Sequence, residues 1–389
     1  MKAVIKKIVK YNPFIYAVYY YLCSFLLKIL GYFVRTHSDT ILFMSFGGRS
    51  FSDSPKEIYN YLESRGPNDL QMIWAFERPE EVESVDDSHK VKVDTLKFFL
   101  VALRAKVWVT NSSIERGLKF KKRNTIYFNT WHGTPLKKMG LDIKNNQSFS
   151  SRADFNRIDK FTVQSDYECD IFSRAFGIDS SKIFKVGLPR NDDLTHQVQR
   201  REDLRRKFGF TDSDQIILYT PTFREFEHNS LHQITSNSYM LMIELVKKLP
   251  ANYKILSRSH YEVDVIKHGD EISDRIIDVS RYPDLNELMH VSDMLVSDYS
   301  SVIFDYSITE KPIFIFSFDF EDYQKMRGMY FNIEDNLLSS RTTDGLSQNI
   351  LNSQESAIQH VKKFKKQYVN FFGTATKQSC QYILKAMQD

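Results

Sequence analysis

The chain has 389 residues, of which 42% are hydrophobic and 26% are charged, and its formal net charge is +4. A chain of this length favours two domains over one, and this composition excludes a largely disordered protein. The three cysteines, Cys23, Cys169 and Cys380, are far apart in the sequence, which excludes a disulfide framework and a CxxC metal motif and indicates a reducing, cytosolic compartment.

The basic residues in excess are confined to the N-terminus, because the first 35 residues contain six lysines and arginines and no acid. This distribution disfavours a nucleic-acid binder, whose basic residues would cover a folded face, and favours contact with an anionic membrane surface. Residues 13–34 are mostly apolar, and Lys28 is their only charged residue. Their five tyrosines favour a helix lying at the membrane surface over one that spans the bilayer. We therefore predict a membrane-associating helix within residues 1–37; a core helix of the first domain is the alternative.

Residues 38–192 alternate short apolar runs with helical stretches, which predicts a parallel sheet covered on both faces, an α/β fold. A helix is expected to begin with Ser54 as its cap and Pro55 at its first position. The predicted strands are 40–46, 70–77, 105–112, 124–130 and 160–165.

The stretch "FKVGLPRNDDL", residues 184–194, ends a strand in Gly and Pro and indicates a domain boundary. A second α/β series follows in residues 193–350, and residues 351–389 are expected to form closing helices, with Cys380, Ile383, Leu384 and Met387 on one packed face. Ligands of such sheets bind outside the carboxyl ends of the strands, so we expect a site in the cleft between the two domains. The predicted strands of the second series are 215–220, 253–260, 275–280, 293–300 and 312–319.

His132 follows the strand-like run "TIYFNT" almost directly, and Gly133 and Thr134 then turn the chain away. It is thus expected at a carboxyl end of the sheet, where an imidazole could accept a proton from a hydroxyl near neutral pH. A histidine that only packs or donates a hydrogen bond is an equally weighted alternative.

The second domain offers several candidate phosphate-binding groups. Arg258 and His260 are two residues apart at a strand end and so face the same side, although an exposed loop explains them as well. Asp298 precedes Ser300 and Ser301 at the start of a helix, where free N–H groups could bind phosphate or where Ser300 could simply cap the helix. Thr222, Arg224 and Arg327 also lie near strand or helix ends, and surface ion pairs are the alternative for the arginines.

The chain contains no Walker loop and no GxGxxG, HExxH or GxSxG motif, which argues against covalent serine chemistry and a zinc site. We expect no metal and no cofactor. A single DxD, at Asp212 and Asp214, precedes a strand at the end away from the expected cleft and is interpreted as a turn.

Five motifs give the sequence a family resemblance over about residue 40 to the C-terminus. They are "NTWHGTPLKKMGLD", "VGLPRND", "YTPTFRE", "RSHY" and "SDYSSVIFDYSITEKPIFIFSFD". In this order they resemble the CDP-glycerol glycerophosphotransferases, the primases and polymerases of wall teichoic acid and related capsule polymers. The resemblance implies a GT-B-like fold in which 38–192 is a Rossmann-like acceptor domain and 193–350 a Rossmann-like domain that binds the CDP-polyol.

The resemblance also implies a reaction, in which an acceptor hydroxyl attacks the phosphate next to glycerol in CDP-glycerol and releases CMP. His132 and His260 take the positions of the family's essential histidines. Arg224, Ser300 and Ser301 take phosphate-binding positions. Gly133, Thr134, Thr222, Arg258, Asp298 and Arg327 complete the expected binding set.

The implied acceptors are undecaprenyl-diphosphate-linked saccharides or polyol-phosphate chains at the cytoplasmic face of the bacterial cell membrane. Three alternatives stay open from the sequence: ribitol-phosphate transfer from CDP-ribitol, a GT-B glycosyltransferase that uses a nucleotide sugar, and a non-catalytic scaffold. The stretch "FFGTATKQ" departs from the family's frequent Asp-Gly near the C-terminus and leaves substrate contacts there open.

Overall fold

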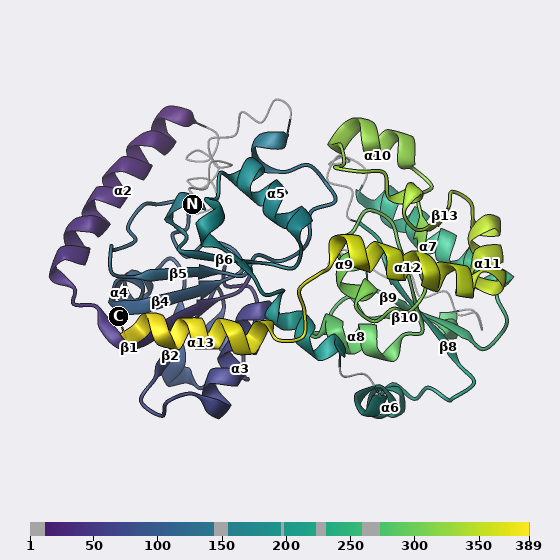
Figure 1. Cartoon of the computed structure of the whole chain (residues 1–389), viewed down its shortest axis with the longest axis horizontal. Coiled ribbons are helices and arrows are strands. Elements are labelled where there is room, and N and C mark those ends of the chain that lie inside the picture. The colour runs from purple at the N-terminus through teal and green to yellow at the C-terminus, as the bar shows by residue number, and fades with distance from the viewer. Residues whose placement is uncertain (1–11, 144–154, 196–197, 223–230, 259–272, 389) are drawn as a thin grey trace. The chain divides into compact units, whose positions relative to one another are not determined.

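The computed structural model describes residues 12–143, 155–195, 198–222, 231–258 and 273–388 (Figure 1). The chain forms two compact units. The first contains Met1–His132, Met139–Asp192 and Thr374–Asp389, and the second contains Gly133–Lys138 and Asp193–Gly373. Each unit is built on a parallel sheet flanked by helices, which confirms the predicted α/β fold with two Rossmann-type halves.

The sheet of the first unit has the order β3-β2-β1-β4-β5-β6-β7 within the described residues. All its pairs are parallel. Its central strands are continuous apolar runs because both faces are covered. The strands are β1 (His37–Met44), β2 (Gln71–Phe76), β3 (Lys90–Lys92), β4 (Ala105–Thr110), β5 (Ile126–Asn129), β6 (Lys160–Val163) and β7 (Ile183–Lys185).

The described helices of the first unit include the closing helix of the chain. They are α2 (Pro13–Phe33), α3 (Asp53–Arg65), α4 (Leu96–Arg104), α5 (Asp166–Phe176) and α13 (Ala375–Gln388). The expected cap at Ser54 is wrong, because α3 already begins at Asp53 and Ser54 is buried inside it. The Ser54 hydroxyl instead accepts a hydrogen bond from the Arg190 N–H (3.3 Å).

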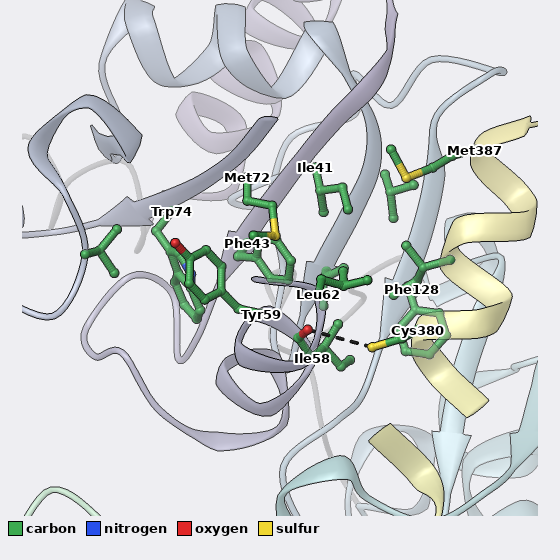
Figure 2. Close-up of a cluster of buried hydrophobic side chains, with 14 of the residues drawn as sticks. Ile41, Phe43, Ile58, Tyr59, Leu62, Met72, Trp74, Phe128, Cys380 and Met387 are labelled. Atoms are coloured by element: carbon green, nitrogen blue, oxygen red, sulfur yellow. Dashed lines mark hydrogen bonds between the residues drawn. The ribbon is translucent and has the colours of Figure 1, made fainter. Parts of the chain in front are cut away.

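Helix α13 packs beside α3 and completes the core of the first unit (Figures 1 and 2). Cys380 and Ile383 are fully buried in the same cluster as Ile58 and Trp74. The Cys380 thiol points at the Ile58 carbonyl, with Sγ and O 3.7 Å apart (Figure 2). The amphipathic face predicted for this helix is therefore confirmed, and the core encloses an unoxidised thiol whose pKa burial raises to about 12.

The sheet of the second unit has the order β10-β9-β8-β11-β12-β13 within the described residues, again all parallel. Its strands are β8 (Gln215–Thr220), β9 (Tyr253–Ser257), β10 (Ile276–Asp278), β11 (Met294–Ser297), β12 (Ile313–Phe316) and β13 (Leu338–Ser340). Its helices are α6 (Val198–Lys207), α7 (Leu231–Lys248), α8 (Leu285–Val291), α9 (Val302–Ser307), α10 (Phe320–Arg327), α11 (Thr343–Asn352) and α12 (Gln354–Tyr368). The DxD segment before β8 is the turn that was predicted, in which Asp214 accepts the Thr211 N–H at 2.7 Å.

Helix α2 lies along the outside of the first unit (Figure 1). Among the described residues it is the helix long and apolar enough to cross a membrane, and 11% of its apolar stretch is buried. One side is fixed to the unit, because Ser24 is 5% exposed and its hydroxyl accepts the Lys119 N–H at 2.9 Å. The other side exposes large apolar side chains, among them Tyr21 and Phe25.

Candidate functional site

Both sheets have a switch point, where the strand order reverses and where open α/β sheets bind their ligands. In the first sheet the reversal lies between β1 and β4, and in the second between β8 and β11. The loop after β1 contains Phe46, and the loop after β4 contains Asn111. The two loops meet, because the Asn111 side-chain oxygen accepts the Phe46 N–H at 2.7 Å.

A cavity of about 770 Å³ opens at the switch point of the first unit. Phe46 and Arg49 line it from the loop after β1, Ser112 and Arg116 from the loop after β4, and His132 from the loop after β5. Its volume is within the range of ligand sites, about 300–1,000 Å³. The sequence thus predicted correctly that His132 follows a carboxyl end of the sheet.

His132 is held in one tautomer by the protein backbone. Its Nδ1 lies 2.8 Å from the Asn111 carbonyl oxygen, and because a carbonyl only accepts, Nδ1 carries the proton and donates it. Nε2 therefore keeps its lone pair, as a general base requires. The ring packs on Trp131, with 4.1 Å between ring centroids, which fixes its plane.

The surroundings of His132 lower its pKa from the ordinary value. Desolvation is the main cause, although the side chain is still reached by solvent from the cavity. The charges of Arg190 and Arg49 also lower this pKa, while Asp53 and the hydrogen bond to Asn111 raise it. The imidazole is therefore neutral at neutral pH.

This pKa predicts the acid limb of the rate profile for any reaction in which His132 takes a proton. A protonated imidazole cannot take a proton, so activity should rise with pH through the pKa of His132 and level off by neutral pH. Since that pKa lies below the ordinary value of about 6.5, the inflection of kcat/KM should also lie below it. Arg49→Gln, which removes one charge that lowers the pKa, should move the inflection to higher pH. An inflection above 6.5 in the unaltered protein would contradict a role of His132 as the proton acceptor.

Residues in the left-handed backbone region cluster around this cavity. Phe46 (φ 48°), Asp94 (φ 59°) and Arg116 (φ 53°) line it, and Trp131 (φ 53°) precedes His132. Such residues cost about 1–3 kcal/mol each and persist only where their surroundings impose them. Asn129 does so for Trp131, because its side-chain oxygen accepts the Trp131 N–H at 2.8 Å. Backbone strain is thus concentrated at the cavity.

The ion pair between Arg116 and Asp94 fixes the far side of the cavity. Arg116 Nε and Nη2 donate to the two carboxylate oxygens at 3.0 and 2.9 Å, and Nη1 donates to the Gly47 carbonyl at 2.9 Å. This bidentate geometry holds the guanidinium rigidly. Glu77 approaches the same guanidinium to 3.9 Å.

At the switch point of the second unit, Asp298 ties two loops together. The carboxylate is 3% exposed and accepts the N–H groups of Thr222 (2.8 Å) and Tyr299 (2.5 Å). Where β8 and β11 end, just before these two loops, the Thr220 and Ser297 hydroxyls are 3.1 Å apart. The structure therefore brings Thr222 and Asp298 together, with Asp298 shaping the loop through backbone amides.

Gly133 lies against Ser301. The glycine has φ 155°, and a Cβ at this position would lie 2.7 Å from the Ser301 hydroxyl and 3.0 Å from its Cβ. Ser300 accepts a long hydrogen bond of 3.4 Å from the Val302 N–H, so the capping alternative is met only weakly. A side chain at position 133 would thus collide with Ser301, the residue directly before α9.

The segment 133–138 belongs to the second unit and is joined to it by an isolated antiparallel bridge between Lys137 and Met329. The Tyr330 N–H donates to the Leu136 carbonyl at 2.9 Å, and the Lys138 N–H donates to the Gly328 carbonyl at 3.2 Å. Thr134, expected in the binding set, is 1% exposed. The motif around His132 is consequently divided, with His132 in the first unit and the residues after it in the second.

The remaining predicted residues are placed as follows. Arg258 donates from Nη1 to the Tyr282 carbonyl at 2.6 Å. Arg327 is the last residue of α10. Arg224 and His260 lie outside the described residues, so their roles stay predictions.

Sequence reasoning missed the residues that build the cavity: Asn111, Asn129, Arg49, Arg116 and Asp94. A signal was present for the asparagines, because each directly follows or ends a buried strand next to the predicted site. Arg49, Arg116 and Asp94 carry no such signal, since only the folded loops bring them to one cavity.

Comparison with known proteins places the chain in a family. Residues 26–388 match the profile of CDP-glycerol:poly(glycerophosphate) glycerophosphotransferase. A teichoic acid glycerol-phosphate transferase of Staphylococcus aureus is 32% identical over 380 residues, which cover 90% of this chain and 94% of the transferase. A teichoic acid poly(glycerol phosphate) polymerase of Staphylococcus epidermidis is 33% identical over 359 residues, which cover 88% of this chain. The chain spans only 50% of that polymerase.

Solved structures are consistent with this family. The wall teichoic acid polymerase TagF has a TM-score of 0.83 at 30% identity, covering 93% of this chain and 92% of that one. A UDP-GlcNAc 2-epimerase from Neisseria meningitidis shares the fold alone, with a TM-score of 0.56 at 14% identity, covering 89% of this chain and 100% of that one.

The fold, the site and these matches define a nucleotide-dependent transferase of GT-B-like architecture. The chain belongs to the CDP-glycerol:poly(glycerophosphate) glycerophosphotransferase family, whose members transfer glycerol phosphate from CDP-glycerol in wall teichoic acid synthesis. The family resemblance and the enzyme class predicted from the sequence are both confirmed.

Proposed function

We propose that His132 is the general base of this transferase and takes the proton of the acceptor hydroxyl. The observation that carries the proposal is the backbone hydrogen bond at Nδ1, which leaves the Nε2 lone pair available on an imidazole that is neutral at neutral pH. The deprotonated hydroxyl attacks the phosphorus next to glycerol, the bond to the CMP oxygen breaks, and CMP leaves with the electron pair.

The second unit is assigned the donor. Transfer of a phosphoryl-type group depends mainly on positioning and charge stabilisation. Ser300, Ser301 and the N–H groups at the start of α9 would hold the diphosphate, with Gly133 leaving room for it. Arg224, Arg258 and His260 would balance the charge that develops on the departing CMP. A TagF structure soaked with CDPG supports this donor class.

We assign the acceptor to a membrane-lipid-linked saccharide or polyol phosphate, with undecaprenyl diphosphate as the lipid carrier, presented at the cytoplasmic face of the membrane. Helix α2 supports a peripheral mode of attachment. Ser24 in the middle of the helix is bonded to the folded unit while large apolar side chains on the other side are exposed, an arrangement suited to a helix that lies in the membrane surface.

A basic groove at the C-terminal end of α2 supports contact with anionic lipid. It has a volume of about 500 Å³ and is lined by Lys28, Tyr32, Arg35 and the run 121–123. Lys121 is paired with Asp159 at 2.9 Å, and Lys122 donates to the Val34 carbonyl at 2.6 Å. Lys28, Arg35 and Arg123 supply further positive charge beside the exposed Tyr32 and Phe33 of the helix.

Neutralising this groove should weaken membrane binding. Each basic residue near an anionic surface contributes about 1 kcal/mol, so the triple change Lys28→Gln, Arg35→Gln and Arg123→Gln should weaken binding to phosphatidylglycerol vesicles about a hundredfold. Vesicle co-sedimentation at fixed salt measures this. The matched control changes three exposed lysines of α12 and α13, Lys363, Lys366 and Lys377, and should bind as the unaltered protein does. Equal losses in both triples would contradict a specific groove.

The reaction itself is tested by its products. Purified protein with CDP-glycerol and a lipid-linked disaccharide should release CMP and add glycerol phosphate to the acceptor, measured by nucleotide chromatography and mass spectrometry. CDP-ribitol in a parallel reaction tests the ribitol alternative, since a ribitol-phosphate primase is also 28% identical over 265 residues. Release of UDP or GDP from a nucleotide sugar, with no CMP from either CDP-polyol, would overturn the proposed function.

A further inference from the structure

We propose that the cavity beside His132 binds the hydroxyl-bearing terminal unit of the acceptor, and that helix α2 forms part of this binding site. The inference rests on the proposed function and deepens it. All the groups that carry it belong to the first unit. Two sources can supply such a unit, a saccharide on a lipid carrier or the terminal glycerol of a polyol-phosphate chain, and both present adjacent hydroxyls.

The chemistry of the cavity lining suits a polyhydroxyl ligand better than a diphosphate. Arg116 is already paired with Asp94 through two hydrogen bonds, and Glu77 lies on the same guanidinium, so its positive charge is compensated. Ser112 and Ser113 add hydroxyls to the lining. Carboxylates and hydroxyls are the groups that bond to ligand hydroxyls, since a carboxylate accepts through about four lone pairs.

Aromatic faces complete the lining. Phe46, Phe99 and Tyr19 contribute rings to the cavity, which gives the apolar faces of a sugar or polyol a surface to contact. Arg49 is the exposed cation of the lining and contributes to the field at His132. It is suited to the one phosphate that would follow the terminal unit of a polyol-phosphate chain.

Tyr19 connects this cavity to the membrane-facing helix. It is a residue of α2 and is 41% exposed, and Tyr21 is exposed on the opposite side of the same helix turn. The loop that follows Arg116 is fixed to α2, because the Lys119 N–H donates to Ser24. An acceptor whose lipid lies against the apolar side of α2 therefore has a short route to His132. Helix α2 would then serve acceptor binding directly, in addition to attachment.

The test uses a soluble acceptor, so that membrane attachment cannot affect the result. With a short glycerol-phosphate oligomer and a lipid-free disaccharide as two separate probes, Tyr19→Ala in the full chain should raise the acceptor KM about tenfold and leave the KM for CDP-glycerol unchanged. Glu77→Gln, at a half-exposed side chain that the fold does not require, should act in the same direction. The matched control is Tyr21→Ala, on the exposed side of the same helix, which should leave both KM values unchanged. The probe whose KM rises in Tyr19→Ala and Glu77→Gln identifies the source of the terminal unit, saccharide or polyol phosphate.

Binding without turnover separates this inference from the proposed function. Saturation-transfer NMR with each probe should show binding to the unaltered protein that weakens in Tyr19→Ala and Glu77→Gln but not in Tyr21→Ala. If CMP release is normal and neither variant changes acceptor KM or binding, the cavity assignment is wrong while the proposed function stands. If neither probe binds the unaltered protein, the cavity assignment is also overturned. If binding follows the expected order but no CDP-polyol is consumed, the proposed function alone fails.

Discussion

Replacing His132 with alanine should lower the rate of glycerol-phosphate transfer by at least about a hundredfold, the usual contribution of an acid–base group. The acceptor hydroxyl would lose the Nε2 lone pair that takes its proton. The loss should appear in kcat, since the donor is assigned to the second unit and its affinity should be kept. Steady-state CMP release with varied CDP-glycerol measures both quantities.

The control for this variant is His37→Ala, which removes an exposed imidazole at the start of β1 in the same unit. It should leave kcat unchanged. Thermal unfolding should stay close to that of the unaltered protein in both variants, because the His132 ring is reached by solvent and is held by one hydrogen bond and by the packing on Trp131. Retained transfer in a folded His132→Ala protein would remove the base assignment and would favour the scaffold alternative. The same loss is predicted from the sequence for His260→Ala.

Gly133→Ala should also reduce transfer strongly, up to about a hundredfold, the loss that a displacement of about 1 Å can cause in a catalytic geometry. The new Cβ would lie 2.7 Å from the Ser301 hydroxyl, so the 133–138 segment or the start of α9 has to move. Both hold groups assigned to the donor phosphates. The KM for CDP-glycerol should rise together with the fall in kcat.

Two further variants isolate the contact. Adding Ser301→Gly to Gly133→Ala removes the Ser301 atoms that clash with the new Cβ. The double variant should therefore be more active than Gly133→Ala, by more than Ser301→Gly alone loses relative to the unaltered protein. A double-mutant cycle measures this coupling. Gly209→Ala is the matched control, because Gly209 also has a positive φ (71°) and a Cβ there meets no atom within 4 Å. It should cost about 1 kcal/mol of stability and leave transfer intact. Independent effects at 133 and 301 would show that the contact does not position the site.

The central strands of both units could be predicted because they are buried on both faces. Ile41, Leu42 and Phe43 in β1 are fully buried, and such runs are visible in the sequence as continuous apolar residues. Two of the edge strands, β3 and β13, are three residues long and only partly buried, and no apolar run marks them. Pairing with a neighbouring strand, rather than local sequence, defines them as strands.

The candidate site was predictable only in part. The places of His132, Thr222 and Asp298 in the fold could be predicted because each follows a strand end, a position that the α/β pattern specifies. The Asn111 hydrogen bonds and the Arg116–Asp94 pair could not be found, because they join loops that are far apart in the sequence. The left-handed backbone at Phe46 and Trp131 was also invisible, since neither residue type favours it and tertiary hydrogen bonds impose it.

The path of the chain through the first unit has a consequence for protein synthesis. The chain leaves this unit at Asp192 and returns only at Thr374, and Asp192 then accepts the N–H groups of Ala375 (2.9 Å) and Thr376 (2.7 Å) at the start of α13. The half that is translated first therefore lacks Cys380 and Ile383 from its hydrophobic core until residues 375–388 emerge from the ribosome. A nascent chain interrupted after residue 373 should hold a complete second unit and an unfinished first one, with an apolar surface open to chaperones.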